Sequence, residues 1–187
     1  MTVINIRPLD TIDLDRMREI IVGHTSTEKY AVKQSVSDTE VRFSLTLKAL
    51  ETPFCQTWQP TEEDAAAYRR ACAEGTCLAA YEGDLMVGVV MAEPRRWNES
   101  LYIWEFHVRP SHHRRGIGWL MMEEMINLAR KHDLRVVVCE TQNTNVPAIR
   151  FYQAMDFTMD GIDLSYYSNE DYENDVVAVF MKRKILG

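Results

Sequence analysis

The sequence predicts one α/β (α+β) domain that spans residues 1–187. Two observations predict this fold class. Segments rich in branched and aromatic residues, typical of β-strands, alternate with segments in which apolar residues recur at the spacing of an α-helix. No internal repeat, low-complexity tract or Gly/Ser-rich linker divides the chain. At this length, the chain can bury roughly 70% of its unfolded surface in one core.

The N-terminal segment is predicted to form a strand, a helix and a loop. Val3–Arg7 alternates apolar and polar residues and predicts the strand. Asp10 or Thr11 is placed to cap a helix over residues 12–22. Residues 24–38 are polar and lack a sustained period, so we expect a loop there, with room for a short helix.

The next segment contains a strand that a proline is expected to interrupt. Arg42–Leu50 alternates well and predicts a strand. Pro53 cannot donate a ladder hydrogen bond, so residues 52–60 are expected to form a loop. Thr61 and Asp64 then have the spacing of a capping box, which predicts a helix start.

That helix is predicted over residues 62–75, with Gly75 as its C-terminal stop. Cys77–Tyr81 and Leu85–Ala92 follow as two strands. The residues between them, Glu-Gly-Asp, are typical of a tight hairpin turn. We therefore expect these strands to pair in antiparallel fashion.

The central stretch predicts a strand, a turn and a helix. Leu101–Val108 is aromatic and branched, and Pro110 ends this strand. From Ile117 onward the apolar residues recur at helical spacing. The turn between them, HHRRGIG, is cationic and contains two glycines. Because unpaired N–H groups point out of a helix N-terminus, the stretch predicts a site for phosphate or pyrophosphate.

The glycine turn alone leaves an alternative, since an ordinary strand-to-helix turn can have the same residues. The third glycine of a dinucleotide-binding fingerprint is missing, and the chain contains no GxxxxGKS/T phosphate loop. Three elements complete the chain. They are a strand buried on both faces (Arg135–Glu140), a helix (Val146–Ala154) and a last strand (Asp175–Lys182).

The central turn resembles the first signature motif, R/Q-x-x-G-x-G/A, of the GNAT superfamily of acetyl-coenzyme A-dependent N-acetyltransferases. His113 stands where that family usually has Arg or Gln. The resemblance implies that acetyl-CoA is the cosubstrate and that the turn holds its pyrophosphate. The residues concerned are His113, Arg114, Arg115, Gly116, Ile117, Gly118 and Trp119.

A second segment, NVPAIRFYQAMDF, is similar to the family motif NxxAxxFYxxxGF. Asn145, Ala148, Tyr152 and Phe157 match, whereas Asp156 stands where the family prefers Gly. Two motifs in this order imply the GNAT fold, a mixed, mostly antiparallel sheet flanked by helices. In that fold two central strands, here 101–108 and 135–140, splay apart to admit the pantetheine arm.

The resemblance also implies roles for cofactor contacts. The main chain of Phe106, His107 and Val108 would pair with the pantetheine amides as an added strand does. Asn145 would hydrogen-bond the pantetheine or a loop, and Ala148 belongs to the same motif. Tyr152 would protonate the departing thiolate, although a buried tyrosine can also serve only in packing.

The proton acceptor for the amine is expected to be a carboxylate, because amines near pKa 10 are mostly protonated at neutral pH. Glu105 on the central strand is the first candidate, and its alternative is an ion pair with a neighbour such as Arg95 or Arg96. Glu140 is the second candidate, as base or as the anion that binds the amine, and its alternative is to cap a loop. For His107 we favour a packing role over that of a base.

The strings RFSLTLKALETPF, RRWN, ETQNTN and IDLSYYSN resemble the streptothricin acetyltransferase group, which acetylates the β-lysine amine of a cationic antibiotic. The expected function is therefore acetyl transfer to a primary amine of a small cationic molecule. The alternatives are a protein N-terminal or lysine acetyltransferase and a non-catalytic acyl-CoA sensor. Residues 156–175 are rich in acids and tyrosines, and form either a solvated loop or part of the acceptor site.

Composition limits the partners. The net charge of −7 argues against nucleic acid, and no apolar run is long enough to span a membrane. The N-terminus lacks the pattern of a signal peptide, and the four cysteines lack disulfide or metal spacing. We therefore expect a cytoplasmic protein with free thiols and no metal; the sequence allows a homodimer.

Overall fold

The computed structural model describes residues 3–185. The chain divides into two compact units. The first unit comprises the described residues of Met1–Gly23, Thr57–Cys139 and Arg183–Gly187, and the second comprises His24–Gln56 and Glu140–Lys182. The prediction of a single domain over 1–187 stays a prediction. None of the helices in the described range is long and apolar enough to cross a membrane.

The first unit contains a mixed sheet. Its strand order is β1-β4-β5-β6-β7, in which the pairs from β1 to β6 are antiparallel and β6 with β7 is parallel. The strands are β1 (Ile4–Pro8), β4 (Leu78–Glu82), β5 (Leu85–Arg95), β6 (Ser100–Val108) and β7 (Val136–Gln142), whose last residues belong to the second unit. This arrangement confirms the predicted mixed, mostly antiparallel sheet.

The ladder between β6 and β7 joins Ser100–Ile103 to Val136–Cys139, although β6 continues to Val108. The predicted splay of these two strands requires such a short ladder. On its other edge β6 carries a register shift opposite Met91 and Ala92, so that Trp104 is an extra residue between paired neighbours. A bulge of this kind changes the direction in which the following side chains point.

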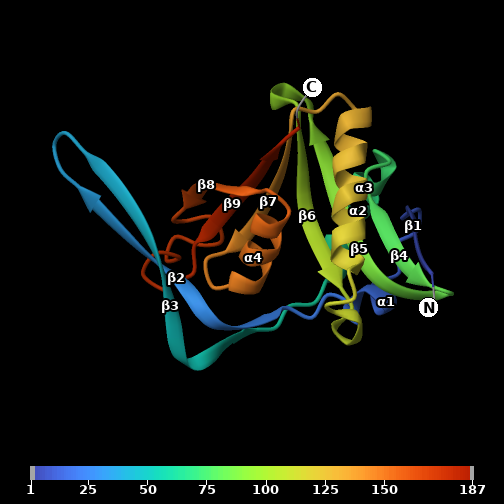
Figure 1. Ribbon diagram of the computed structural model, residues 1–187, viewed down its shortest axis with the longest axis horizontal. Helices are drawn as coiled ribbons and strands as arrows, with labels where there is room; N and C mark the ends of the chain where they lie inside the picture. Colours follow the sequence, from blue (N-terminus) through green and yellow to red (C-terminus); the bar gives the residue numbers. More distant parts are fainter. Residues whose placement is uncertain (1–2, 186–187) are drawn as a thin grey trace. The chain divides into compact units, whose positions relative to one another are not determined.

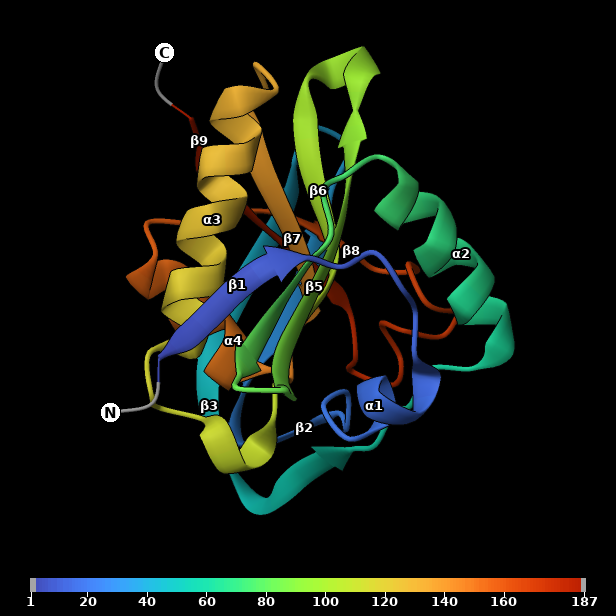
Figure 2. The same ribbon diagram turned by 90° about the vertical axis from the view of Figure 1, so that its right-hand side faces the viewer.

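Helices cover both faces of this sheet, as Figure 2 shows for α2 (Glu62–Ala73) and α3 (Ile117–Lys131). On one face, α2 and α1 (Leu14–Arg18) share a buried core with β4 and β5. On the other, α3 buries its apolar side chains, and a Cβ placed on Gly88 of β5 would lie 2.6 Å from Met121 Sδ. Two short 3₁₀-helices, Arg96–Asn98 and Pro110–His112, flank β6.

The second unit is built around a long antiparallel hairpin of β2 (His24–Val36) and β3 (Val41–Gln56), drawn in blue and teal in Figure 1. It also contains α4 (Val146–Ala154) and the antiparallel pair β8 (Thr158–Asp163) and β9 (Ala178–Lys184), whose last two residues belong to the first unit. The predicted bounds of α4 are confirmed. Strand β8 was not predicted, and the predicted last strand begins three residues later than expected.

Two predictions in the second unit were wrong. Residues 24–36 of the predicted loop form β2. The apolar Tyr30, Val32 and Val36 lie on one face of this strand, and Gln34 interrupts their alternation. Strand β3 does not end before Pro53 but runs to Gln56. Pro53 lies where the ladder is broken, between the pairs Glu28–Ala49 and Ser26–Phe54, so no ladder hydrogen bond is lost to it.

The predicted helix over 12–22 is also shorter than expected. α1 covers only Leu14–Arg18, and its N-cap is Asp13 rather than Asp10 or Thr11. The side chain of Asp13 accepts a hydrogen bond from the Arg16 backbone N–H at 3.2 Å. Ile20 and Ile21 are buried, although they follow the end of the helix. In contrast, the predicted capping box of Thr61 and Asp64 is confirmed at the start of α2.

Candidate active site

The turn between β6 and α3 leaves the first helical turn open to an anion. Gly116 is the N-cap of α3 with φ of +80°, and no side chain of the described residues caps this helix. Arg114 also has a positive φ, of 59°. A Cβ on Gly116 would meet nothing within 4 Å, so the space beside it is open. Backbone N–H groups at such a helix start suit a diphosphate through hydrogen bonds and the helix dipole.

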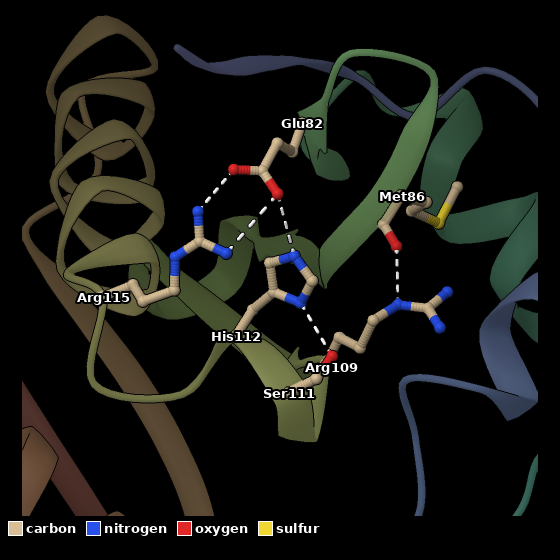
Figure 3. A network of polar contacts seen from close by, with 6 residues as sticks. All are labelled: Glu82, Met86, Arg109, Ser111, His112 and Arg115. Carbon is tan, nitrogen blue, oxygen red and sulfur yellow. Dashed lines mark hydrogen bonds and ion pairs between the residues drawn. The ribbon is translucent and has the colours of Figure 1, made fainter. Parts of the chain in front are cut away.

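A carboxylate network holds this turn against the β4–β5 hairpin (Figure 3). Glu82, at the end of β4, forms an ion pair with Arg115 and a 3.1 Å contact with His112 Nε2. The other ring nitrogen of His112 lies 2.9 Å from Ser111 Oγ. The hydrogen bonds from Arg115 and His112 lower the pKa of Glu82 below its usual value. The turn is therefore fastened by side chains and by the His113 N–H, which donates to the Pro110 carbonyl at 3.3 Å. Among the described residues, no acceptor occupies the N–H groups of residues 114–119.

Two residues predicted to contact the phosphates, His113 and Arg115, have hydrogen-bond partners within the protein. Arg115 donates to Glu82, so its charge is balanced inside the protein. His113, at the position where the family usually has Arg or Gln, lies with Nε2 2.7 Å from the carbonyl oxygen of Val108. It thus links the turn to the end of β6. The contacts predicted for His113 and Arg115 with coenzyme A stay predictions.

Glu105 lies on β6 between two partners. Its Oε1 accepts a hydrogen bond from the Tyr68 hydroxyl at 3.0 Å, and its Oε2 lies 2.7 Å from His107 Nε2. Neither Arg95 nor Arg96 is the neighbour that pairs with Glu105, since these side chains pair with Glu93 and Glu74. The packing role favoured for His107 is also incomplete, because its ring nitrogen contacts a carboxylate.

Tyr68 was not singled out from the sequence. It comes from α2, is only 3% exposed, and has a pKa raised mainly by burial and further by Glu105. Its helical spacing with Ala65 and Ala71, both buried, could have placed it on the inward face of α2. That spacing could not have shown which strand residue it meets.

In the second unit, the residues of the second motif lie on α4 or next to its ends. Asn145 is the N-cap of this helix, and its Oδ1 accepts a hydrogen bond from the Ala148 N–H at 3.3 Å. Tyr152 is 6% exposed and its ring lies beside those of Phe151 and Phe157. Asp156 has φ of 62°, which explains the family's preference for Gly there. Aspartate tolerates this left-handed conformation better than most residues.

Glu140 and the acidic segment 156–175 are joined to one another. The Tyr167 hydroxyl donates to Glu140 Oε1. Asp171 is 4% exposed and accepts hydrogen bonds from the Tyr167 N–H at 2.7 Å and from Ser168 Oγ at 2.7 Å. Hydrogen bonds thus fix the segment at Glu140 and Asp171, although residues 165–170 are exposed. The two alternatives for the segment stay open.

Several acids of this segment have partners within the second unit. Asp175 pairs with Lys29, Asp160 lies 3.0 Å from Lys182 Nζ, and Asp163 accepts from the Ser165 N–H at 2.9 Å. Glu140 was predicted to act as base or as the anion that binds the amine, and that role stays a prediction. The described residues contain no group of three or more His, Cys, Asp or Glu that could hold a metal ion.

Comparison with known proteins defines the class. The family model of the acetyltransferase (GNAT) family matches residues 44–157, which is more than half of the chain. The chain therefore belongs to the acetyltransferase (GNAT) family.

Among curated relatives, the streptothricin acetyltransferase of Streptomyces lavendulae is 30% identical over 113 residues, or 60% of this chain and 59% of the relative. The L-2,4-diaminobutyric acid acetyltransferase of Vibrio cholerae is 31% identical over 83 residues, or 43% of this chain and 47% of the relative. The N-alpha-acetyltransferase 60 of Drosophila melanogaster is 38% identical over 71 residues, or 36% of this chain and 25% of the relative. The matches thus span about three fifths of the first relative, and less of the others.

Two solved structures share the fold over nearly the whole chain. One is a Bacillus anthracis protein assigned as a streptothricin acetyltransferase, in complex with acetyl coenzyme A, with a TM-score of 0.75, 22% identity and 98% coverage of both chains. The other is nourseothricin acetyltransferase, with a TM-score of 0.72, 21% identity and coverage of 98% of this chain and 99% of that one. At these identities the likeness supports the GNAT fold.

Proposed function

We propose that this protein is an N-acetyltransferase that moves the acetyl group of acetyl-CoA to a primary amine of a small cationic molecule. The observation that carries the proposal is the start of α3, which has no side-chain cap and follows a Gly116 turn within the family's first motif. Such a start presents several N–H donors to one anion. The donor set fits a diphosphate, and membership of the family supports acetyl-CoA as the molecule that carries it.

Cofactor contacts are proposed for each unit by itself. In the first unit, the main chain from His113 to Trp119 would hold the diphosphate, with Arg114 beside it. The main chain of Phe106–Val108 would hold the pantetheine arm; Val108 keeps a second lone pair on the carbonyl that His113 contacts. In the second unit, Asn145 and Ala148 are the proposed cofactor contacts, and Asn145 fixes the start of α4.

When bound, acetyl-CoA supplies an activated acetyl group as a thioester. The protein must then remove a proton from the amine and supply one to the departing sulfur. Glu105 is the proposed centre for amine deprotonation, and the Tyr152 hydroxyl is the proposed proton donor. Glu140, held by Tyr167, would attract the cationic amine.

The acceptor proposed is a streptothricin-type antibiotic. The support is the match to the streptothricin acetyltransferase of Streptomyces lavendulae, whose name states its substrate. The match to N-alpha-acetyltransferase 60 favours a second candidate, a protein N-terminus or lysine, over a shorter stretch of 71 residues. A sensor that binds acyl-CoA without turnover is the third candidate. A cytoplasmic location and a homodimer stay predictions.

One experiment separates these candidates. The purified protein is mixed with acetyl-CoA and, in turn, streptothricin, L-2,4-diaminobutyrate, a polyamine and short peptides, and release of free thiol is followed. The proposal expects release with streptothricin above that with peptides. Release with peptides alone would favour the second candidate, and calorimetric binding without release would favour the sensor. Gly118→Glu, which places a carboxylate in the turn, should weaken acetyl-CoA binding; unchanged binding would contradict the proposed diphosphate site.

A further inference from the structure

We infer that His107 accepts the proton of the acceptor amine, and that Glu105, held in place by Tyr68, orients His107 for this task. The inference rests on the proposed function and assigns its proton acceptor to a different side chain. Glu105 thereby becomes a positioning residue, and Tyr68 a second one that acts through it.

The first argument is the tautomer of His107. An ionised carboxylate can only accept hydrogen bonds, so the 2.7 Å contact with Glu105 Oε2 requires that His107 Nε2 carries a hydrogen. In the neutral imidazole the lone pair then lies on Nδ1. Among the described residues, no hydrogen-bonding partner contacts Nδ1. Glu105 therefore selects the tautomer whose other nitrogen can accept a proton.

The second argument is exposure. The side chain of Glu105 is 17% exposed and both of its oxygens have partners, whereas that of His107 is 25% exposed. An amine can therefore approach the imidazole more readily than the carboxylate behind it. Both residues point to the same side because they are two positions apart on β6, beyond the extra residue Trp104.

The third argument is Tyr68 of α2, the second partner of Glu105. Burial raises the pKa of the Tyr68 hydroxyl far above neutrality, and the charges of Glu105 and Asp64 raise it further. Tyr68 therefore remains a hydrogen-bond donor at every pH at which the enzyme would work. Its 3.0 Å bond to Oε1 fixes the carboxylate, which in turn fixes the imidazole. The three side chains form a chain of contacts from α2 to His107.

The proposed step is balanced as follows. His107 Nδ1 takes one proton from the substrate ammonium and becomes an imidazolium, whose charge faces Glu105. The amine nitrogen then forms a bond to the thioester carbonyl carbon, and the carbon–sulfur bond breaks. The nitrogen then gives up one of its two remaining protons and the departing thiolate takes up one, so that an amide and a free thiol are formed. His107 returns its own proton to water before the next cycle.

The kinetic test compares wild type with His107→Gln, Glu105→Gln and Tyr68→Phe across pH, using thiol release with streptothricin. General bases typically contribute about 100- to 10,000-fold, so His107→Gln should lower kcat/KM by at least about 100-fold. It should also abolish the acid limb of the pH profile, which is the fall of kcat/KM as the pH is lowered. Glu105→Gln should lower kcat/KM but keep the acid limb, because His107 is still present while the carboxylate that orients it is lost. Tyr68→Phe should cause a smaller loss and keep the limb.

His132, exposed at the end of α3, offers a matched control, and His132→Gln should leave rate and pH profile unchanged. The opposite pattern would overturn the inference: His107→Gln retaining rate and acid limb while Glu105→Gln abolishes both would make Glu105 the base itself. If wild type releases thiol and His107→Gln releases it at the same rate with the same pH profile, only this inference is overturned. Absence of release with every amine would remove the proposed function as well.

A spectroscopic test needs no turnover. In ¹⁵N-histidine NMR spectra recorded above the titration range of histidine, His107 should carry its hydrogen on Nε2 and none on Nδ1. Its signal is assigned by its disappearance in His107→Gln, and Glu105→Gln should reduce the fraction of this tautomer. A hydrogen on Nδ1 in the wild type would overturn the inference.

Discussion

Asn143 gives the sharpest test of what holds the second unit together. Its side chain is fully buried and makes three hydrogen bonds to main-chain groups from different segments. The amide donates to the carbonyls of Tyr30 at 2.9 Å and Asp175 at 3.2 Å, and accepts from the Val177 N–H at 2.8 Å. The amide thus joins β2 to the segment that precedes β9.

Asn143→Ala removes all three bonds and leaves two part-buried carbonyls and the buried Val177 N–H without this partner. At about 1 kcal/mol for each bond the loss is about 3 kcal/mol, and it rises toward 5 kcal/mol if the stranded groups stay dry. Asn143→Asp should not rescue stability, because a carboxylate can accept from Val177 but cannot donate to the two carbonyls. Asn127→Ala, at an exposed position of α3, is the control and should change stability by at most about 0.5 kcal/mol.

Urea unfolding measured by far-UV circular dichroism and by tryptophan fluorescence checks this prediction. All four tryptophans lie in the first unit: Trp58, Trp97, Trp104 and Trp119. Coincident transitions from the two probes would show that the units unfold together and would permit one free energy of unfolding. A loss below about 1 kcal/mol for Asn143→Ala would refute the reasoning, since it would mean that the amide is replaced without cost.

Three further perturbations follow from the first unit. Gly88→Ala should destabilise the protein by about 1–3 kcal/mol, because its Cβ would lie 2.6 Å from the buried Met121 sulfur, and Gly88→Val should be worse; thermal unfolding measures both. Thr61→Ala breaks the capping box with Asp64 and should cost about 1 kcal/mol by the same assay, whereas Thr61→Ser should be nearly neutral. Glu82 has a lowered pKa when folded, so its contribution to stability is present above its usual pKa of 4.5 and is lost as the pH falls through the folded value. Glu82→Gln should therefore be less stable than wild type at neutral pH, and urea titrations should show the gap closing in acid; a constant gap would contradict the ion-pair explanation.

The sequence was most informative where one segment determined its own structure. The bounds of α4 and the start of α3 at Ile117 follow from helical spacing next to a proline or glycine. The capping box of Thr61 was visible for the same reason, since both partners lie within one turn. In contrast, β2 is stabilised by its pairing with β3, and Gln34 on its apolar face concealed the alternation.

The site was only partly predictable because its contacts join distant segments. Glu105 was identified as a candidate, but its partner Tyr68 lies 37 positions away on a helix. Similarly, Arg115 was expected near phosphate on the strength of its place in the motif, whereas Glu82, 33 positions away, neutralises it. Neither pairing leaves a periodic signal in the sequence, because each depends on how a helix or hairpin packs against the sheet.

The neutralised guanidinium has a consequence for ionic strength. If Arg115 remains with Glu82, the diphosphate is held by peptide dipoles rather than by the full charge of that residue. Sodium chloride would then screen the attraction only weakly, and the dissociation constant for acetyl-CoA would rise little with salt. Freeing the guanidinium by Glu82→Gln would restore a mobile cation beside the ligand, and the same titration would become steeper.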